Sequence, residues 1–290
     1  MALSIVTNTA SMMVRTNLNN ATGTMNTAIE RMTTGFKINN AKDNAAGYNI
    51  MDTMTAKIGS FDVAYDNAQI GLDMLTTAEE NYSLITEHLQ RVRDLTEQAS
   101  NGTYSTESRE AIDAEIKARL EEIDRVASIA EYNGMGLMDD SIDTKLAIQV
   151  GIYGDKDSRI ILDKSLFRLT STVALMGDTA SALSGYMSGT KTSATTGMTH
   201  CSDFLSIIDS AIKDIASRVT DLGAAQNRLE SAMSAIDTNI QQLTASRSTI
   251  RDADISEEST SYISAQVLQS AAATLLATAN QTPSIALQLI

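Results

Sequence analysis

The sequence predicts a mainly α-helical protein: a long antiparallel helical rod or coiled-coil bundle with paired N- and C-terminal helices and one small β-hairpin region. Three observations lead to this prediction. Apolar residues recur at alternating steps of four and three over most of the chain, which is the seam spacing of coiled coils. The 290 residues include a single proline, so long helices can continue without interruption. Aromatic residues make up only 4% of the chain, so aliphatic, methionine and alanine side chains must build the core.

The first predicted helix lies within residues 1–42, where the only charged residue before Glu30 is Arg15. Asparagine, threonine and serine occupy the face opposite the seam. A helix with neutral polar residues on its outer side is better suited to be surrounded by copies of itself than to stand alone in water. Its seam has the heptad spacing of Val14, Leu18, Ala21, Met25, Ala28 and Met32.

A second helix is expected from about Asp43. A helix from Ala45 to Ala99 would be about 80 Å long at about 1.5 Å per residue, which suits a rod better than a globule. Its predicted seam has one fault at Glu79 and consists of Met54, Ile58, Phe61, Tyr65, Ala68, Leu72, Leu75, Tyr82, Leu89 and Val92. After a polar turn at residues 100–105, a third helix is predicted from the stripe of Ile112, Ile116, Leu120, Ile123 and Val126.

The middle of the chain has a different pattern. Alternating residues near 145–162 predict a β-hairpin. Residues 163–203, rich in serine, threonine and glycine, are expected to form a short variable surface insert. Helical spacing returns at Phe204, and no charged side chain occurs from Ser259 to Ile290. We therefore expect an inner assembly core of residues 1–42 plus 255–290, and a helical rod core of residues 43–162 plus 204–254.

Composition excludes several classes of function. A net charge of −14 disfavours nucleic acid and anionic membrane surfaces, because binding to phosphates depends on lysine and arginine. No stretch approaches 18 apolar residues, and no signal-peptide pattern occurs in residues 1–30. The two histidines, His88 and His200, form no HExxH helix, and Asp139, Asp140 and Asp143 lack the spacing of a calcium loop. We expect no enzyme activity, metal or cofactor, and composition alone would suggest a cytosolic protein.

Several longer runs are more specific than these patterns. They are NTASMMVRTNLN and AIERMTTGFKINNAKDNAAG near the start, LQRVRDL and RLEEIDRVA further on, and LGAAQNRLESAMSAI, LTASRSTIRDADISEE and AQVLQSAAATLLATANQTP near the end. These runs resemble the two terminal regions of bacterial flagellins. The resemblance covers both ends of the chain, whereas the middle is short, which implies a reduced central domain.

The resemblance implies a structural subunit of the bacterial flagellar filament, which is exported unfolded through the flagellar type III apparatus and serves swimming motility. It implies an extracellular location in the filament. The implied partners are further copies of the same chain, an export chaperone, the cap protein, hook-associated proteins and the host flagellin-sensing Toll-like receptor. The alternatives are a hook–filament junction protein and a cytoplasmic coiled-coil signalling rod, although the uncharged ends speak against the latter.

Three sets of residues are candidates for these roles. The receptor-contact motif of the family corresponds here to Gln90, Arg91, Leu95, Gln98 and Glu115, which could equally pack neighbouring subunits. The apolar stripes of the ends suggest assembly through Val14, Leu18, Met25, Ile263, Val267, Leu268, Leu275 and Leu276. The insert carries candidate O-glycosylation sites, as in many flagellins, at Ser181, Ser184, Ser188, Thr190, Thr192, Ser193, Thr195 and Thr196. The single cysteine, Cys201, is expected to be a solvent-exposed thiol.

Overall fold

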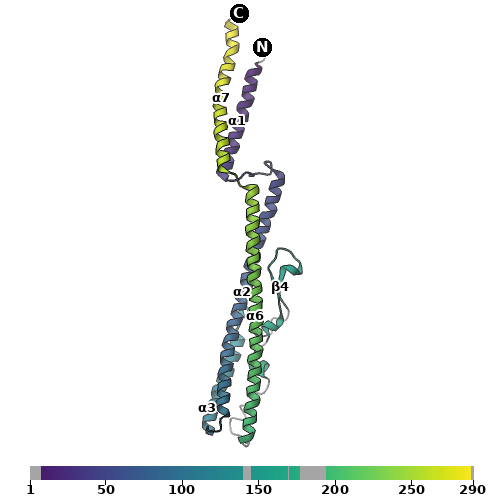
Figure 1. The fold of residues 1–290 in the computed structure, drawn as a ribbon, viewed down its shortest axis with the longest axis vertical. Coiled ribbons are helices and arrows are strands. Elements are labelled where there is room, and N and C mark those ends of the chain that lie inside the picture. Colours follow the sequence, from purple (N-terminus) through teal and green to yellow (C-terminus); the bar gives the residue numbers. More distant parts are fainter. Residues whose placement is uncertain (1–7, 140–144, 169, 177–193, 289–290) are drawn as a thin grey trace. The chain divides into compact units, whose positions relative to one another are not determined.

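The computed structural model describes residues 8–139, 145–168, 170–176 and 194–288 (Figure 1). Its long helices are α1 (Thr9–Thr34), α2 (Ala45–Ser100), α3 (Thr106–Ile129), α6 (Ala194–Arg251) and α7 (Ile255–Gln288), and α4 (Thr172–Met176) is short. The strands are β1 (Glu131–Tyr132), β2 (Met135–Gly136), β3 (Leu146–Gln149) and β4 (Arg159–Leu162), with 3₁₀ helices η1 (Lys156–Ser158) and η2 (Lys164–Phe167). The predicted mainly α fold with a small β-hairpin is confirmed. Among the described residues, no helix combines the length and the hydropathy needed to cross a bilayer.

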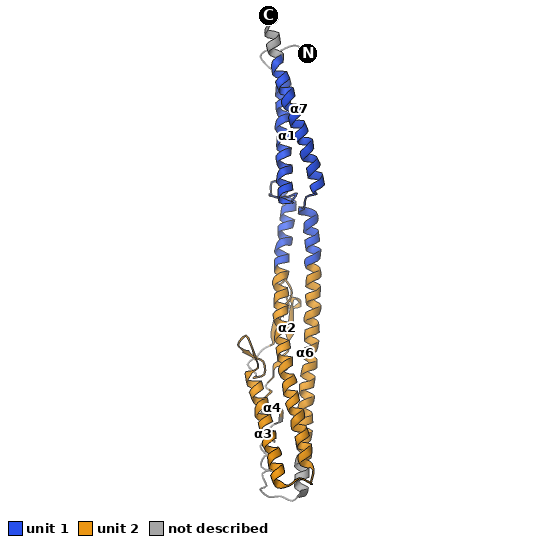
Figure 2. Ribbon diagram, turned by 90° about the vertical axis from the view of Figure 1, so that its left-hand side faces the viewer, with its two compact units in different colours: residues 1–59, 240–290 blue, residues 60–239 orange. Residues whose placement is uncertain are grey.

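The chain forms two compact units (Figure 2). Unit 1 comprises residues 1–59 and 240–290, and unit 2 comprises residues 60–239. Helices α2 and α6 each contribute to both units. The predicted division at residues 42 and 255 followed the change in charge along the chain, whereas the division by contacts falls inside the two longest helices.

In unit 1, the terminal helices α1 and α7 pack against each other in antiparallel directions, so the expected pairing of the ends is present. Near one end of the pair, Asn8 Nδ2 donates to the carbonyl oxygen of Ala279 at 2.8 Å. Near the other, Arg31 Nη1 lies 2.9 Å from Glu258 Oε1. Asn8 also caps α1, and the helix ends at Gly35, whose φ of 75° is in the left-handed region that glycine adopts without strain.

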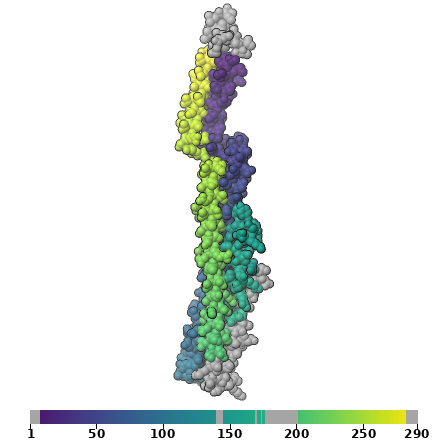
Figure 3. Space-filling view, turned by 45° about the vertical axis from the view of Figure 1, so that its right-hand side comes forward, coloured from purple at the N-terminus to yellow at the C-terminus, as the bar shows by residue number. Residues whose placement is uncertain are grey.

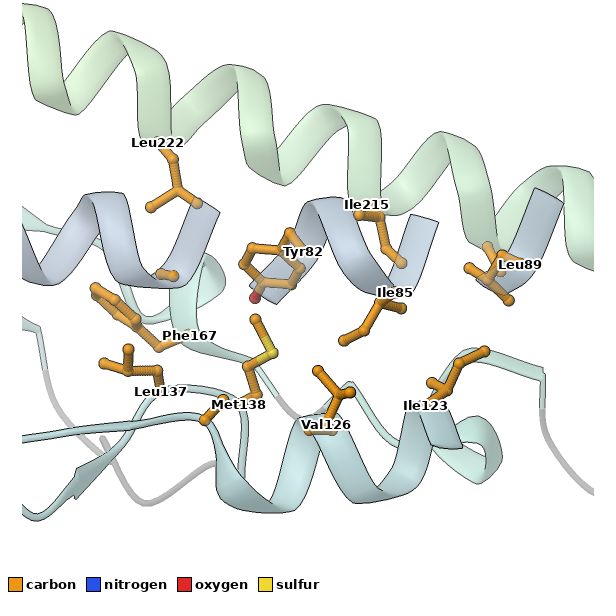
Figure 4. Packing of buried hydrophobic residues seen from close by; sticks show 14 of the residues in the cluster. Tyr82, Ile85, Leu89, Ile123, Val126, Leu137, Met138, Phe167, Ile215 and Leu222 are labelled. Atoms are coloured by element: carbon orange, nitrogen blue, oxygen red, sulfur yellow. The ribbon is translucent and has the colours of Figure 1, made fainter. Parts of the chain in front are cut away.

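The core of unit 2 lies between α2, α3 and α6 (Figure 4). Helix α2 contributes Tyr82, Ile85 and Leu89, and the side chains around them come from α3, from α6 and from the segments that carry Leu137, Met138 and Phe167. Tyr82 is fully buried, and its hydroxyl donates to the carbonyl oxygen of Leu166 at 2.8 Å, so the buried polar atom is satisfied. The predicted stripe of α3 is buried in full.

Two β-hairpins complete unit 2. The short β1–β2 hairpin turns through Asn133 and Gly134, both with positive φ, as a two-residue Asn-Gly turn requires. The predicted hairpin near 145–162 is β3–β4, in which Ile148 pairs with Ile160. It packs on α2 where that helix has Gly71: a Cβ at this position would lie 2.4 Å from Ile148 Cδ1. Gly71 is therefore the place where the hairpin approaches the helix backbone.

The structure corrects the predicted seam of α2. Tyr65 is 37% exposed, and Ala64 takes the buried position beside it. The apparent fault at Glu79 disappears, because the fully buried Ala78 continues the seam. Alanine is a weak hydrophobic signal in a sequence, although its small side chain lets helices approach closely. The prediction therefore chose the larger neighbouring residue at Tyr65, one position from the buried alanine.

The predicted surface insert of residues 163–203 is also corrected at both of its described ends. Leu166 and Phe167 of η2 are buried in the core of unit 2. Helix α6 begins at Ala194, ten residues before the predicted return of helical spacing. Cys201, expected at the surface, is only 3% exposed, because it lies one turn before Phe204 on the buried stripe of α6. The insert was assigned by its polar composition, which conceals these few core residues.

Candidate functional site

The most unusual surface of unit 1 is a row of large aliphatic side chains on α7. Ile263 is 57%, Val267 62%, Leu268 61% and Leu275 58% exposed. We call these four residues the α7 apolar face. Contiguous exposed apolar surface in a soluble protein marks an interaction site or an aggregation risk. These four were among the predicted assembly residues, and the structure leaves all of them unburied within the chain.

Small side chains explain why this face points outward. The buried apolar positions between α1 and α7 are Ala21 and Ala28 on one helix, and Ala265 and Ala272 on the other. Both pairs are seven residues apart, which keeps them on one side of their helices. The buried Glu258, which pairs with Arg31 of α1, lies seven residues before Ala265. Alanine seams draw the helices together and leave no room for leucine or isoleucine there. Because Val267 follows Ala265 by two residues, it is turned about 200° away from the seam.

The other assembly candidates divide differently. Val14, Leu18, Met25 and Leu276 are half-buried at the edges of the alanine seam. The predicted stripe contained both Leu275 and Leu276, but in the structure Leu275 is exposed and Leu276 is half-buried. Thus one group of the predicted assembly residues packs between α1 and α7. The other group, the α7 apolar face, stays exposed and is available for contacts with other molecules.

A groove of 630 Å³ runs between the two helices beside this face. In the space-filling view, α1 and α7 lie against each other along the upper part (Figure 3). The groove is lined by both apolar and neutral polar side chains: Val14, Leu268 and Leu275 are apolar, and Asn17 and Asn20 are polar. None of these lining residues is charged. Its chemistry fits an apolar helix with neutral polar flanks, which is also the chemistry of α1 and α7 themselves.

The receptor-contact candidates lie on α2 and α3 in unit 2. Arg91 donates to Glu115 Oε1 through Nε at 3.0 Å and through Nη2 at 2.8 Å, so the two residues form one exposed pair. Gln90 and Gln98 are exposed, and Gln98 donates to the Tyr104 hydroxyl at 2.8 Å. Leu95 differs from the other four: it is 2% exposed and belongs to the core. The motif therefore provides four surface residues and one packing residue.

The candidate glycosylation sites Ser181, Ser184, Ser188, Thr190, Thr192 and Ser193 lie outside the described residues. Thr195 and Thr196 lie in the first turn of α6 rather than in the predicted loop.

Cys201 is the one cysteine of the chain, and burial raises the pKa of its thiol, an effect that Arg109 partly opposes. Among the described residues, no group of His, Cys, Asp and Glu side chains is arranged to hold a metal ion.

Sequence reasoning missed the seam residues Ala21, Ala28, Ala265 and Ala272 as a set. Ala21 and Ala28 appear in the predicted seam of α1, but the partner alanines of α7 do not. The available signal was their shared interval of seven residues. This interval is hard to recognise in the sequence because alanine is a weaker hydrophobic signal than the larger aliphatic residues around it.

Comparison with known proteins identifies relatives over most of the chain. Residues 5–143 match the family model of the bacterial flagellin N-terminal helical region, and residues 205–290 match that of the C-terminal helical region. A flagellin of Halalkalibacterium halodurans is 32% identical, covering 91% of this chain and 90% of the relative. The flagellar filament 33 kDa core protein of Treponema phagedenis is 30% identical, covering 98% of both chains.

One solved structure has a similar fold. It is a flagellar hook-associated protein from Vibrio parahaemolyticus, described as putative, with a TM-score of 0.61 and 13% identity. The match covers 72% of this chain and 100% of the other. At this identity the likeness concerns the fold alone.

Proposed function

The chain belongs to the bacterial flagellin family, and from this premise we propose that it is a structural subunit of the flagellar filament that polymerises through α1 and α7. The filament is extracellular and serves swimming. In this proposal the subunit travels unfolded through the flagellar type III apparatus with the help of an export chaperone, and the cap protein and hook-associated proteins are its neighbours at the filament ends.

The observation that carries the proposal is the α7 apolar face. Burying a large aliphatic side chain contributes about 1.5–3 kcal/mol, and four such side chains are more than half exposed in unit 1. A repeated contact with other copies removes this surface from water. The absence of charge from Ser259 to Ile290 supports the same role, because charged side chains would have to be desolvated in a contact surrounded by other subunits.

The test is a substitution on the α7 apolar face. Leu268→Asp should leave the circular dichroism of the monomer unchanged, because this side chain is 61% exposed, and it should abolish seeded polymerisation in light scattering and electron micrographs. Leu268→Met is the matched control, which retains an apolar side chain and should polymerise. Deletion of residues 259–290 should likewise give soluble monomers. Long filaments from the Asp variant or from the truncated chain would contradict the proposal.

A second proposed role is recognition of the monomer by the host flagellin-sensing Toll-like receptor. The observation that favours it is the exposed Arg91–Glu115 pair within the motif. Arginine is a frequent anchor of protein interfaces. We expect Arg91→Ala to weaken receptor binding by about tenfold or more, which corresponds to about 1.4 kcal/mol. Arg93→Ala is the control, since Arg93 lies on the same helix but binds Asp209. Equal receptor affinities for the two variants would contradict this role.

We also propose O-glycosylation of the candidate serines and threonines between Ser181 and Thr196. The support is their density in the sequence and the surface location of such inserts in the family. Intact-mass measurement on natively produced protein tests it: a mass of 31.1 kDa, that of the bare chain, would remove the proposal for the strain tested.

A further inference from the structure

The solvent-facing side of α2 in unit 2 carries a regular line of acidic side chains. The buried seam of this helix passes through Ala64, Ala68, Leu75, Ala78, Tyr82, Ile85, Leu89 and Val92. Opposite this seam, an acidic residue occurs at every seventh position, and all five are exposed: Asp66, Asp73, Glu80, Glu87 and Asp94. We call them the acidic ridge. Seven residues advance a helix by about 10.5 Å and turn it by only about −20°, so the ridge is nearly straight.

An apolar stripe runs beside the ridge. Val63 is 59%, Ile70 55% and Leu84 48% exposed, and they share one heptad position. Their side chains are not needed for the core of unit 2, which the seam residues already fill. Within the described part of the chain, no residue of the ridge forms an ion pair, although Asp73 accepts a hydrogen bond from Gln69. The ridge and the stripe together form an unpartnered helix face.

The opposite chemistry occurs in the segment of the β3–β4 hairpin. Residues 145–168 carry five basic and three acidic side chains, whereas residues 60–100 of α2 carry eight acidic and two basic ones. The hairpin also exposes apolar side chains of its own: Tyr153 is 59% and Ile161 45% exposed. One surface is apolar and acidic, and the other is apolar with an excess of two basic side chains. Lys145 of the hairpin already pairs with Asp163 of its own chain at 3.8 Å, whereas Lys156 and Arg168 are exposed.

The hairpin cannot reach the ridge of its own chain. Ile148 packs against Gly71, which lies on the buried side of α2. Asp73 follows Gly71 by two residues and is therefore turned about 200° away from the hairpin. Two complementary surfaces that point in different directions on one chain can be joined only between copies.

We propose that the acidic ridge and its apolar stripe dock residues 145–168 of a second copy of this chain. This contact rests on the proposed filament function and adds to it a second interface, separate from α1 and α7. Because the two surfaces differ, the contact is heterologous, and such contacts can repeat into an open helical polymer. Its electrostatic part also makes the contact sensitive to salt, since the Debye length falls to about 3 Å at 1 M.

The experiment compares charge reversals in the full-length chain. Asp73→Lys/Glu80→Lys reverses the middle of the ridge, and Asp214→Lys/Glu230→Lys makes the same change in net charge at exposed positions of α6. With a net charge of −14 per subunit, general relief of repulsion would speed the polymerisation of both variants alike. We expect instead that seeded polymerisation slows at least fivefold for the ridge variant and does not slow for the α6 control.

A compensating change identifies the partner surface. Lys156→Glu/Arg168→Glu, at two exposed basic residues of the hairpin segment, should also slow polymerisation. Combining it with the ridge reversal in one chain should restore the rate to within about twofold of the unmodified protein. Circular dichroism checks that each variant is folded. The inference is overturned if the ridge and α6 variants behave alike, or if the combination recovers nothing. Failure of the unmodified chain to polymerise would instead count against the proposed function itself.

Discussion

The two units of this protein place their large hydrophobic side chains in opposite ways. Unit 2 buries Tyr82, Leu137 and Phe167 almost completely among three helices and the hairpin segment. In unit 1 the buried apolar positions between α1 and α7 are alanines, whereas Leu268 and its neighbours on the α7 apolar face are more than half exposed.

This difference indicates where each unit obtains its stability. A buried aromatic or leucine side chain removes far more apolar area from water than an alanine does. Unit 2 therefore gains its hydrophobic stabilisation within the single chain. Unit 1 leaves much of that gain for contacts with other copies, as expected for a subunit whose ends fold into an assembly. The following predictions test this comparison, from the largest expected effect to the smallest.

Tyr82→Ala should destabilise unit 2 by about 3–5 kcal/mol, because it removes a fully buried aromatic ring and leaves the carbonyl oxygen of Leu166 without its hydroxyl donor. Chemical denaturation followed by circular dichroism measures the loss. Tyr65→Ala is the control on the same helix and should cost less than half as much, because Tyr65 keeps 37% of its surface exposed whereas Tyr82 is fully buried. Similar losses for both variants would mean that the seam of α2 is not where the structure places it.

Ala28→Leu should destabilise the α1–α7 pair by about 1–3 kcal/mol, since a leucine does not fit a seam position that is 1% exposed. Hydrogen exchange of the α1 and α7 amides would report the loss locally. Asn26→Leu, two residues earlier and on the exposed side, controls for the added apolar surface. If Ala28→Leu slowed exchange instead, the seam would have room for larger side chains, and the contrast between the units would weaken.

Cys201 tests how far the core of unit 2 extends. A thiol reagent should modify it at least about tenfold more slowly in the folded protein than in denaturant, a factor equal to about 1.4 kcal/mol. Burial raises the pKa of the thiol, so less reactive thiolate is present near pH 8, and the rate should rise only at higher pH than for an ordinary cysteine. Ser202→Cys in a Cys201→Ala background provides an exposed thiol for comparison. Equal rates at the two positions would contradict the burial of Cys201.

Leu268→Ala should have the smallest effect on the monomer, less than about 0.5 kcal/mol, because its side chain is 61% exposed. Thermal unfolding of the soluble monomer measures it. The same substitution should slow seeded polymerisation, in contrast to Tyr82→Ala, whose damage is to the folding of unit 2. A loss of several kcal/mol in the monomer would show that the α7 apolar face already has a partner within the chain.

Much of the fold could be predicted from the sequence because heptad spacing is a strong signal when it persists over many turns. The stripe from Ile112 to Val126 and the one from Phe204 to Leu229 were assigned to helices from their spacing, and the alternation near Leu146 indicated the hairpin. The α7 apolar face was also visible as a run of aliphatic residues without charge. What the spacing could not reveal was the direction in which each stripe points, because the same spacing suits a stripe that faces its own chain and one that faces another copy.

The sequence by itself determined the helices, the pairing of the two ends and the family, since propensity, periodicity and long ordered motifs are properties of the chain read along its length. The tertiary structure alone decided that alanines rather than leucines join α1 to α7, that Cys201 and Phe167 belong to the core, and that Gly71 admits Ile148. The physical reason is that burial depends on which elements approach each other and how closely. The small residues that permit the closest approach carry the weakest hydrophobic signal in the sequence.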